Sequence, residues 1–134
     1  MRKIILVALL ALPCCVHNVR PLHRYEIAIG PFYERPTHSF AGSLMYENGC
    51  LVFNGDNGSP RLLPIWPYGT KFVESLVTFH RPSKDDERAV LNQEIRLDGI
   101  PANWSQLDPA TFAPFHQQCG WAKPFFVSGL APAN

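Results

Sequence analysis

Residues 42–72 read GSLMYENGCLVFNGDNGSPRLLPIWPYGTKF, and this stretch decides the fold. Two short apolar runs flank Asn48 and Gly49, and Asn-Gly is the strongest short signal for a β-hairpin because both residues tolerate a positive φ. A second turn rich in Gly and Asn at 54–59 leads back into another apolar run at 61–66. Successive short strands joined by tight turns indicate the centre of a small β-domain.

The flanking sequence adds further strands. Thirteen prolines and nine glycines interrupt the chain too often for long helices. Residues 24–29 alternate apolar with polar side chains, which predicts a half-buried first strand. Residues 71–80 and 87–97 predict another strand pair, and residues 124–130 a final strand. We therefore expect an all-β fold, a small barrel or sandwich of about six to seven strands.

One short helix is expected near residues 109–117. Asp108 is suited to the N-cap and Pro109 to the first helical position, where its missing N–H has no cost. Pro114 is expected to limit this helix to one or two turns, because proline inside a helix removes a backbone hydrogen bond.

The N-terminus has the features of an export signal. Arg2 and Lys3 precede the apolar run 4–12, which is too short to span a bilayer. We expect residues 1–15 to be a signal peptide. Residues 16–40 would then supply the N-terminal strand and a connecting loop, and residues 41–134 the core of the same single β-domain.

The end of the signal leaves two outcomes open. Cys14 and Cys15 stand where an exported lipoprotein would be cut and acylated, although Pro13 replaces the small residue expected there. One outcome is a lipid anchor on Cys14 or Cys15, and the other is a soluble product cut near residues 15–18. Either way we expect an exported protein, periplasmic or secreted.

The charge balance restricts the partners. Once Arg2 and Lys3 are removed, ten basic residues face eleven acidic ones. A near-neutral domain argues against nucleic acid, whose binding proteins usually carry a strongly basic face. No apolar run after the signal is long enough to cross a membrane. The expected partner is an envelope protein or a small ligand that the sequence does not identify.

Cys50 and Cys119 remain after the signal, and two cysteines in an oxidising compartment most simply form one disulfide. Its long loop would give it a contribution of about 4 kcal/mol to the free energy of unfolding. The alternative is a metal site in which His116 joins the two cysteines, but no fourth ligand accompanies them. We therefore expect neither a metal nor a cofactor.

Several of these motifs together resemble a group of small exported bacterial proteins of unassigned function. The group shares a Gly-Cys-Leu strand, a Trp-Pro turn and a late cysteine, which correspond here to Gly49–Leu51, Ile65–Pro67 with Gly69, and Cys119 followed by Phe125–Gly129. The resemblance covers most of residues 41–130. It implies an exported, disulfide-linked β-domain and no particular activity.

Four aromatic residues are candidates for partner binding. Trp66, Tyr68, Trp104 and Trp121 all lie in predicted turns or loops, and Trp and Tyr in such positions often anchor partners. The alternative is that they cover the open ends of the β-domain as part of its core. A cluster of exposed aromatic residues at one end would favour binding.

The sequence contains no motif of a known catalytic site. It has no Gly-x-Ser-x-Gly elbow, and its nearest candidates are His80 with Glu74 and the corner from His116 to Cys119. We therefore expect a structural or partner-binding role in the cell envelope and no catalysis. The alternative is a small secreted inhibitor or ligand carrier that presents the loop 65–69, and a hydrolase is the least favoured reading.

Overall fold

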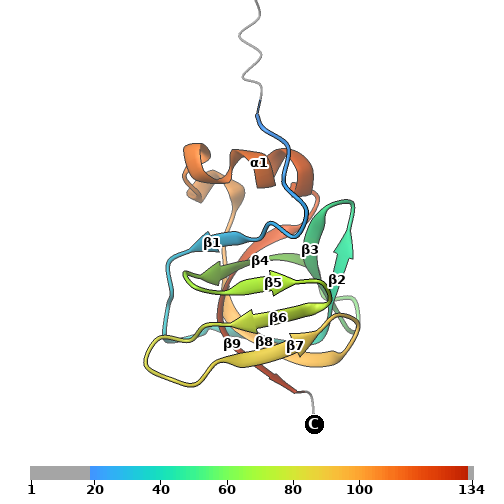
Figure 1. Ribbon diagram of the computed structural model, residues 1–134, viewed down its shortest axis with the longest axis vertical. Helices are drawn as coiled ribbons and strands as arrows, with labels where there is room; N and C mark the ends of the chain where they lie inside the picture. The colour runs from blue at the N-terminus through green and yellow to red at the C-terminus, as the bar shows by residue number, and fades with distance from the viewer. Residues whose placement is uncertain (1–18, 133–134) are drawn as a thin grey trace, which may run out of the picture.

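The computed structural model describes residues 19–132 of the 134-residue chain. The expected signal peptide, with Cys14 and Cys15, lies outside these residues. The fold is mostly β, with nine strands in two sheets, one α-helix and one disulfide. The expected all-β class is thus confirmed. Two strands more than the expected upper number are present, and the architecture is sandwich-like (Figure 1).

The elements follow one another in the order β1 (Ala28–Gly30), β2 (His38–Glu47), β3 (Cys50–Gly55), β4 (Arg61–Pro67), β5 (Lys71–Val73), β6 (Leu76–Phe79), β7 (Glu87–Val90), β8 (Glu94–Pro101), the 3-10 helix η1 (Trp104–Gln106), α1 (Pro109–Cys119) and β9 (Lys123–Pro132).

Six strands form the larger sheet in the order β1-β4-β3-β2-β8-β9, and this sheet curls until β4 also pairs with β9. It is nevertheless not a closed barrel. The β3–β4 ladder contains two residue pairs, Phe53 with Leu62 and Asn54 with Arg61. It stops two residues before Pro64, which lacks the N–H that a continued ladder would require at that position.

Strands β5, β6 and β7 form a second, antiparallel sheet. The expected single pairing of residues 71–80 with 87–97 is therefore wrong in detail. Glu74 has φ 57° and turns the chain between β5 and β6, while Asn92 has φ 65° and turns it between β7 and β8. Each turn splits one expected strand into two, and β8 joins the larger sheet instead.

The Asn48-Gly49 hairpin is confirmed. Asn48 has φ 51° and Gly49 has φ 78°, and Glu47 pairs with Cys50 across the turn. Two successive positive φ angles are the geometry that a type I′ turn requires, and its twist matches the twist of the paired strands. Local backbone preference therefore fixes the β2–β3 register.

The first strand is shorter than expected. Residues 24–27 form a turn and an extended segment, with Tyr25 at φ 63°, and β1 begins at Ala28. The period-two pattern of residues 24–29 puts Ala28 on the solvent side, yet Ala28 is buried. It is buried because β1 pairs in parallel with β4 and both faces of β1 are covered. Tertiary contact thus overrides the period-two pattern.

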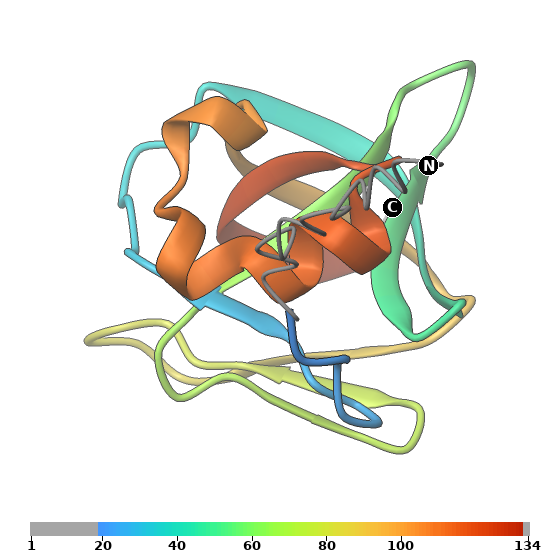
Figure 2. The ribbon, with the colours of Figure 1, turned by 90° about the horizontal axis from the view of Figure 1, so that it is seen from above.

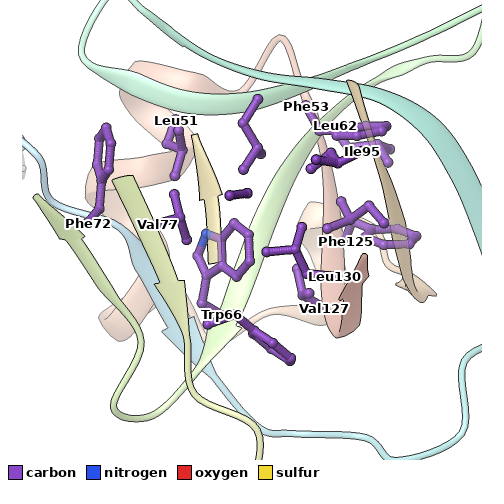
Figure 3. Packing of buried hydrophobic residues seen from close by; sticks show 14 residues of the cluster. Leu51, Phe53, Leu62, Trp66, Phe72, Val77, Ile95, Phe125, Val127 and Leu130 are labelled. Atoms are coloured by element: carbon purple, nitrogen blue, oxygen red, sulfur yellow. The ribbon is translucent and has the colours of Figure 1, made fainter. Parts of the chain in front are cut away.

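The main core lies between the two sheets. Figure 3 shows Trp66 at its centre, surrounded by side chains from β3, β8 and β9 and by Val77 of β6. Trp66 and Phe53 have no exposed surface, and the ring of Phe79 lies 6.1 Å from that of Trp66. Fully burying side chains of this size stabilises the fold by about 1.5–3 kcal/mol each.

A second core lies beneath α1, which crosses the end of the molecule in Figure 2. Phe112, Phe115 and Cys119 of α1 pack on Val52 and Ile65 of the larger sheet. Cys119 is bonded to Cys50, with the two Cα atoms 6.0 Å apart. The disulfide therefore joins the last residue of the helix to the first residue of β3.

The helix confirms the expected start but is longer than expected. Asp108 is the N-cap, and its Oδ1 accepts a hydrogen bond from the backbone N–H of Ala110 at 3.2 Å. Pro114 is buried inside this eleven-residue helix, and the helix continues past it to Cys119. Within residues 19–132, no helix is long and apolar enough to cross a membrane.

Candidate functional site

The four aromatic candidates separate into three locations. Trp66 lies in β4 with no exposed surface, so the expectation that it sits in a turn and anchors a partner is wrong. Its strand continues because Trp66 pairs with Ile29 of β1. Tyr68 is 86% exposed in the turn after β4. Trp104 and Trp121 lie together and border the same surface hollow.

This hollow, which we call the Trp pocket, has a volume of about 240 Å³ and is lined by residues 102–104 and 120–124. It is shallow and lies where η1 and the turn after α1 meet the start of β9. Its lining residues include two tryptophans and the polar residues Asn103 and Lys123. A surface of this composition can hold a ligand that is apolar on its faces and polar at its edges.

A second hollow, the helix groove, adjoins the first at Trp104. Its volume is about 330 Å³, and it is bordered by Val19, Trp104, Leu107 and the side of α1 that carries Phe112 and His116. Its exposed lining is mainly apolar. Together the Trp pocket and the helix groove form one continuous surface, which we call the aromatic end.

Trp104 is held in place from two sides. Its Nε1 donates a hydrogen bond to the carbonyl oxygen of Ala122 at 3.0 Å. Its ring stacks on that of His116, with centroids 4.6 Å apart and planes within 5° of parallel. The preceding residue is also fixed, since the Asn103 N–H donates to Gln106 Oε1 at 2.9 Å. The indole is therefore positioned before any ligand arrives.

Trp121 is 45% exposed and has one charged neighbour. The guanidinium of Arg61 lies 5.5 Å from the centroid of its ring, within cation–π distance. Arg61 is in turn ion-paired with Glu47, whose Oε2 lies 2.9 Å from Nη1. The charge of Arg61 is therefore already matched by Glu47.

The aromatic end is attached to the sheet by more than the disulfide. Gln118 Nε2 donates to the carbonyl oxygen of Asn48 at 2.8 Å, and Gln118 Oε1 accepts from the N–H of Leu22 at 3.3 Å. One side chain thus links the end of α1, the β2–β3 turn and the N-terminal segment. These hydrogen bonds connect the aromatic end to the β2–β3 turn and to the N-terminal segment.

Asp108, at the start of α1, borders the helix groove. Hydrogen bonds from the side chain of Thr111 and from the backbone N–H of Ala110 hold the pKa of its carboxyl below the usual range. This shift is the ordinary consequence of capping a helix, where N–H groups favour the ionised form. It indicates a structural carboxylate rather than a general acid.

The catalytic candidates are not assembled as expected. His80 Nδ1 lies 2.9 Å from Asp86 Oδ1 rather than beside Glu74, and both partners are largely exposed. At the other corner, His116 stacks on Trp104 while Cys119 is oxidised. The alternative metal site of Cys50, His116 and Cys119 is therefore wrong. Across residues 19–132, no three His, Cys, Asp or Glu side chains group closely enough to hold a metal ion.

Sequence reasoning identified Trp104 and Trp121 but missed the residues around them. Lys123, Leu107 and Phe112 carry no motif, and only the packing of α1 against the sheet brings them to the two indoles. No family model, curated protein or solved structure matches the chain.

Proposed function

We propose that the chain is an exported β-domain of the cell envelope that binds a partner, without catalysis, through its aromatic end. The observation that carries this proposal is that Trp104 and Trp121 border one pocket next to an apolar groove. Trp121 is 45% exposed and Trp104 is half-buried. Tryptophans supply large contact areas at a small entropic cost, and they are enriched where partners bind most strongly.

The disulfide supports the export half of the proposal, because such bonds persist in oxidising compartments. The proposal includes removal of the signal peptide. Cleavage after residue 15 would release a soluble product, whereas cleavage before Cys14 or Cys15 would leave that cysteine as the lipid-anchored first residue. Val19, the first described residue, borders the helix groove. An anchor on Cys15 would stand four residues from Val19 and hold that residue, at the border of the helix groove, within about 14 Å of the anchored cysteine.

The geometry gives less support to the alternative of a secreted inhibitor. That role requires residues 65–69 to protrude as a rigid loop. Instead Ile65 and Trp66 are buried in β4, and the turn is closed by a hydrogen bond from the N–H of Thr70 to the carbonyl of Pro67. Tyr68 alone of this segment's large side chains projects into solvent.

Photo-crosslinking in the native envelope tests the proposal. Benzoylphenylalanine replaces Trp121 in one variant and Tyr68 in a matched control, and intact mass reports any adduct whatever its chemical class. We expect a discrete adduct at position 121 and none at position 68. No adduct at 121, or equal adducts at both positions, would contradict the proposal.

A further inference from the structure

We propose that the Trp pocket binds an acidic saccharide, through a pyranose ring that carries a carboxylate. This inference deepens the proposed function by naming the ligand class of the same site. It rests on the shape and composition of the pocket, on the fixed position of Trp104 and on an unmatched cation at its edge.

The shape and composition of the pocket fit a sugar ring. A pyranose presents C–H groups on its faces and hydroxyl groups around its rim, so it packs on the electron-rich face of an aromatic ring while its rim makes hydrogen bonds. The Trp pocket offers Trp104 and Trp121 for the faces and the amide of Asn103 for the rim. Its volume of about 240 Å³ is enough for one hexose.

The preorganisation of the rings favours a small, weakly apolar ligand. Trp104 is fixed by its hydrogen bond to Ala122 and by its stack on His116, and the guanidinium of Arg61 lies over the ring of Trp121. Immobilising a free side chain on binding costs about 0.5–1.5 kcal/mol. Because Trp104 is already placed, a ligand that buries little apolar surface does not have to supply the ordering energy of that side chain.

The charge at the pocket edge selects an acidic sugar over a neutral one. Arg61 is paired with Glu47, whereas Lys123, which borders the pocket, forms no ion pair within residues 19–132. Lys123 is exposed at the start of β9. An exposed cation next to stacked aromatic rings matches a carboxylate on the rim of a sugar.

Titration of the mature protein with three matched probes tests the inference. The probes are β-1,4-linked triglucuronate, its neutral counterpart cellotriose, and triglutamate as an acidic peptide. We expect saturable binding of triglucuronate, followed by tryptophan fluorescence and amide chemical shifts, with at least fivefold weaker binding of cellotriose. Equal binding of triglutamate would overturn the inference, because the site would then be an anion site without sugar selectivity.

Variants assign the binding to named groups. W121A is expected to weaken triglucuronate binding at least tenfold, and K123Q to remove the preference over cellotriose. Y68A and K71Q are the matched controls, because each removes an exposed aromatic or cationic side chain outside the Trp pocket. Binding that W121A leaves unchanged, or that Y68A weakens equally, would overturn the inference.

The outcome is separable from that of the proposed function. If triglucuronate does not bind but position 121 still forms a protein adduct in the envelope, the saccharide inference is wrong and the binding role stands. If position 121 forms no adduct and no probe binds, both are wrong.

Discussion

The indole of Trp104 and the imidazole of His116 lie parallel, 4.6 Å apart, at the boundary between the Trp pocket and the helix groove. His116 belongs to α1 and Trp104 to the 3-10 helix that precedes it, so the stack joins the two elements that form the aromatic end. The Nε1 of Trp104 also donates a hydrogen bond to the carbonyl oxygen of Ala122, which follows α1. The same contacts therefore stabilise the fold and place the candidate binding surface.

Replacing His116 with alanine tests the stabilising role of this stack. H116A is expected to lower the free energy of unfolding by about 0.5–1.5 kcal/mol, the contribution typical of an aromatic pair. H116F should retain most of that stability because it preserves a ring at the same place. Urea unfolding measures both. An equal loss in H116A and H116F would show that the stack itself contributes nothing.

The disulfide should provide a large share of the stability of this small domain. Replacing Cys50 and Cys119 together with serine is expected to lower the free energy of unfolding by about 2–5 kcal/mol, since the bond closes a long loop and joins α1 to β3. Denaturant unfolding of the double variant, compared with the oxidised protein, measures this loss. A loss below about 1 kcal/mol would mean that the second core holds α1 without the bond.

Gln118 should matter more than its neighbour Gln117. Q118A removes the hydrogen bonds to Asn48 and Leu22 and is expected to cost about 1 kcal/mol of unfolding free energy. Q117A, on the same helix but at the edge of the groove, is the matched control and should change stability little. Equal effects of the two variants would contradict the bridging role of Gln118.

A side chain at Gly49 should displace the amide of Gln118, which then loses its hydrogen bond to Asn48. A Cβ at Gly49 would stand 2.2 Å from Gln118 Nε2, and the φ of 78° is unfavourable for alanine. G49A is therefore expected to cost about 1–2 kcal/mol from the backbone conformation alone. The clash adds to this cost. In the double variant with Q118A the cost of G49A should fall, and strict additivity of the two changes would show that the residues do not interact.

Glu94 gives a pH dependence with a defined sign. A hydrogen bond between its carboxyl and that of Asp56 raises the pKa of Glu94 above its ordinary value. The folded state thus holds this proton more tightly than the unfolded state. The contribution of protonated Glu94 to the free energy of unfolding is therefore full at low pH and is lost as the pH rises through the raised pKa. The melting temperature of E94Q minus that of wild type should therefore increase from pH 4 to pH 7. A difference that shrinks over that range would contradict this assignment.

Local backbone chemistry explains which parts of the fold the sequence predicts. Asn48 and Gly49 determine their turn, and Asp108 with Pro109 determines the start of α1, because in both cases the interacting groups are a few residues apart. The division of the strand at Glu74 was missed because its positive φ is unusual for glutamate.

Non-local contacts explain what the sequence does not predict about the site. Trp66 precedes proline and looked like a turn residue, yet pairing with β1 keeps it in a buried strand. Trp104 and Trp121 meet because α1 folds back between them and β9 pairs with β4. These non-local contacts leave no periodic signal in the sequence. The sequence therefore indicates Trp104 and Trp121 as candidates because they are tryptophans in predicted loops, but it does not predict that they border one pocket.

The most direct test of the binding role is hydroxyl-radical footprinting of the unmodified protein in its native envelope and after purification. Trp121 and Tyr68 are both exposed, and they lie at the aromatic end and beyond the far end of β4, respectively. The account predicts that oxidation of Trp121 falls several-fold in the envelope while that of Tyr68 is unchanged. Equal oxidation of Trp121 in the two states would contradict the claim that the aromatic end holds a partner.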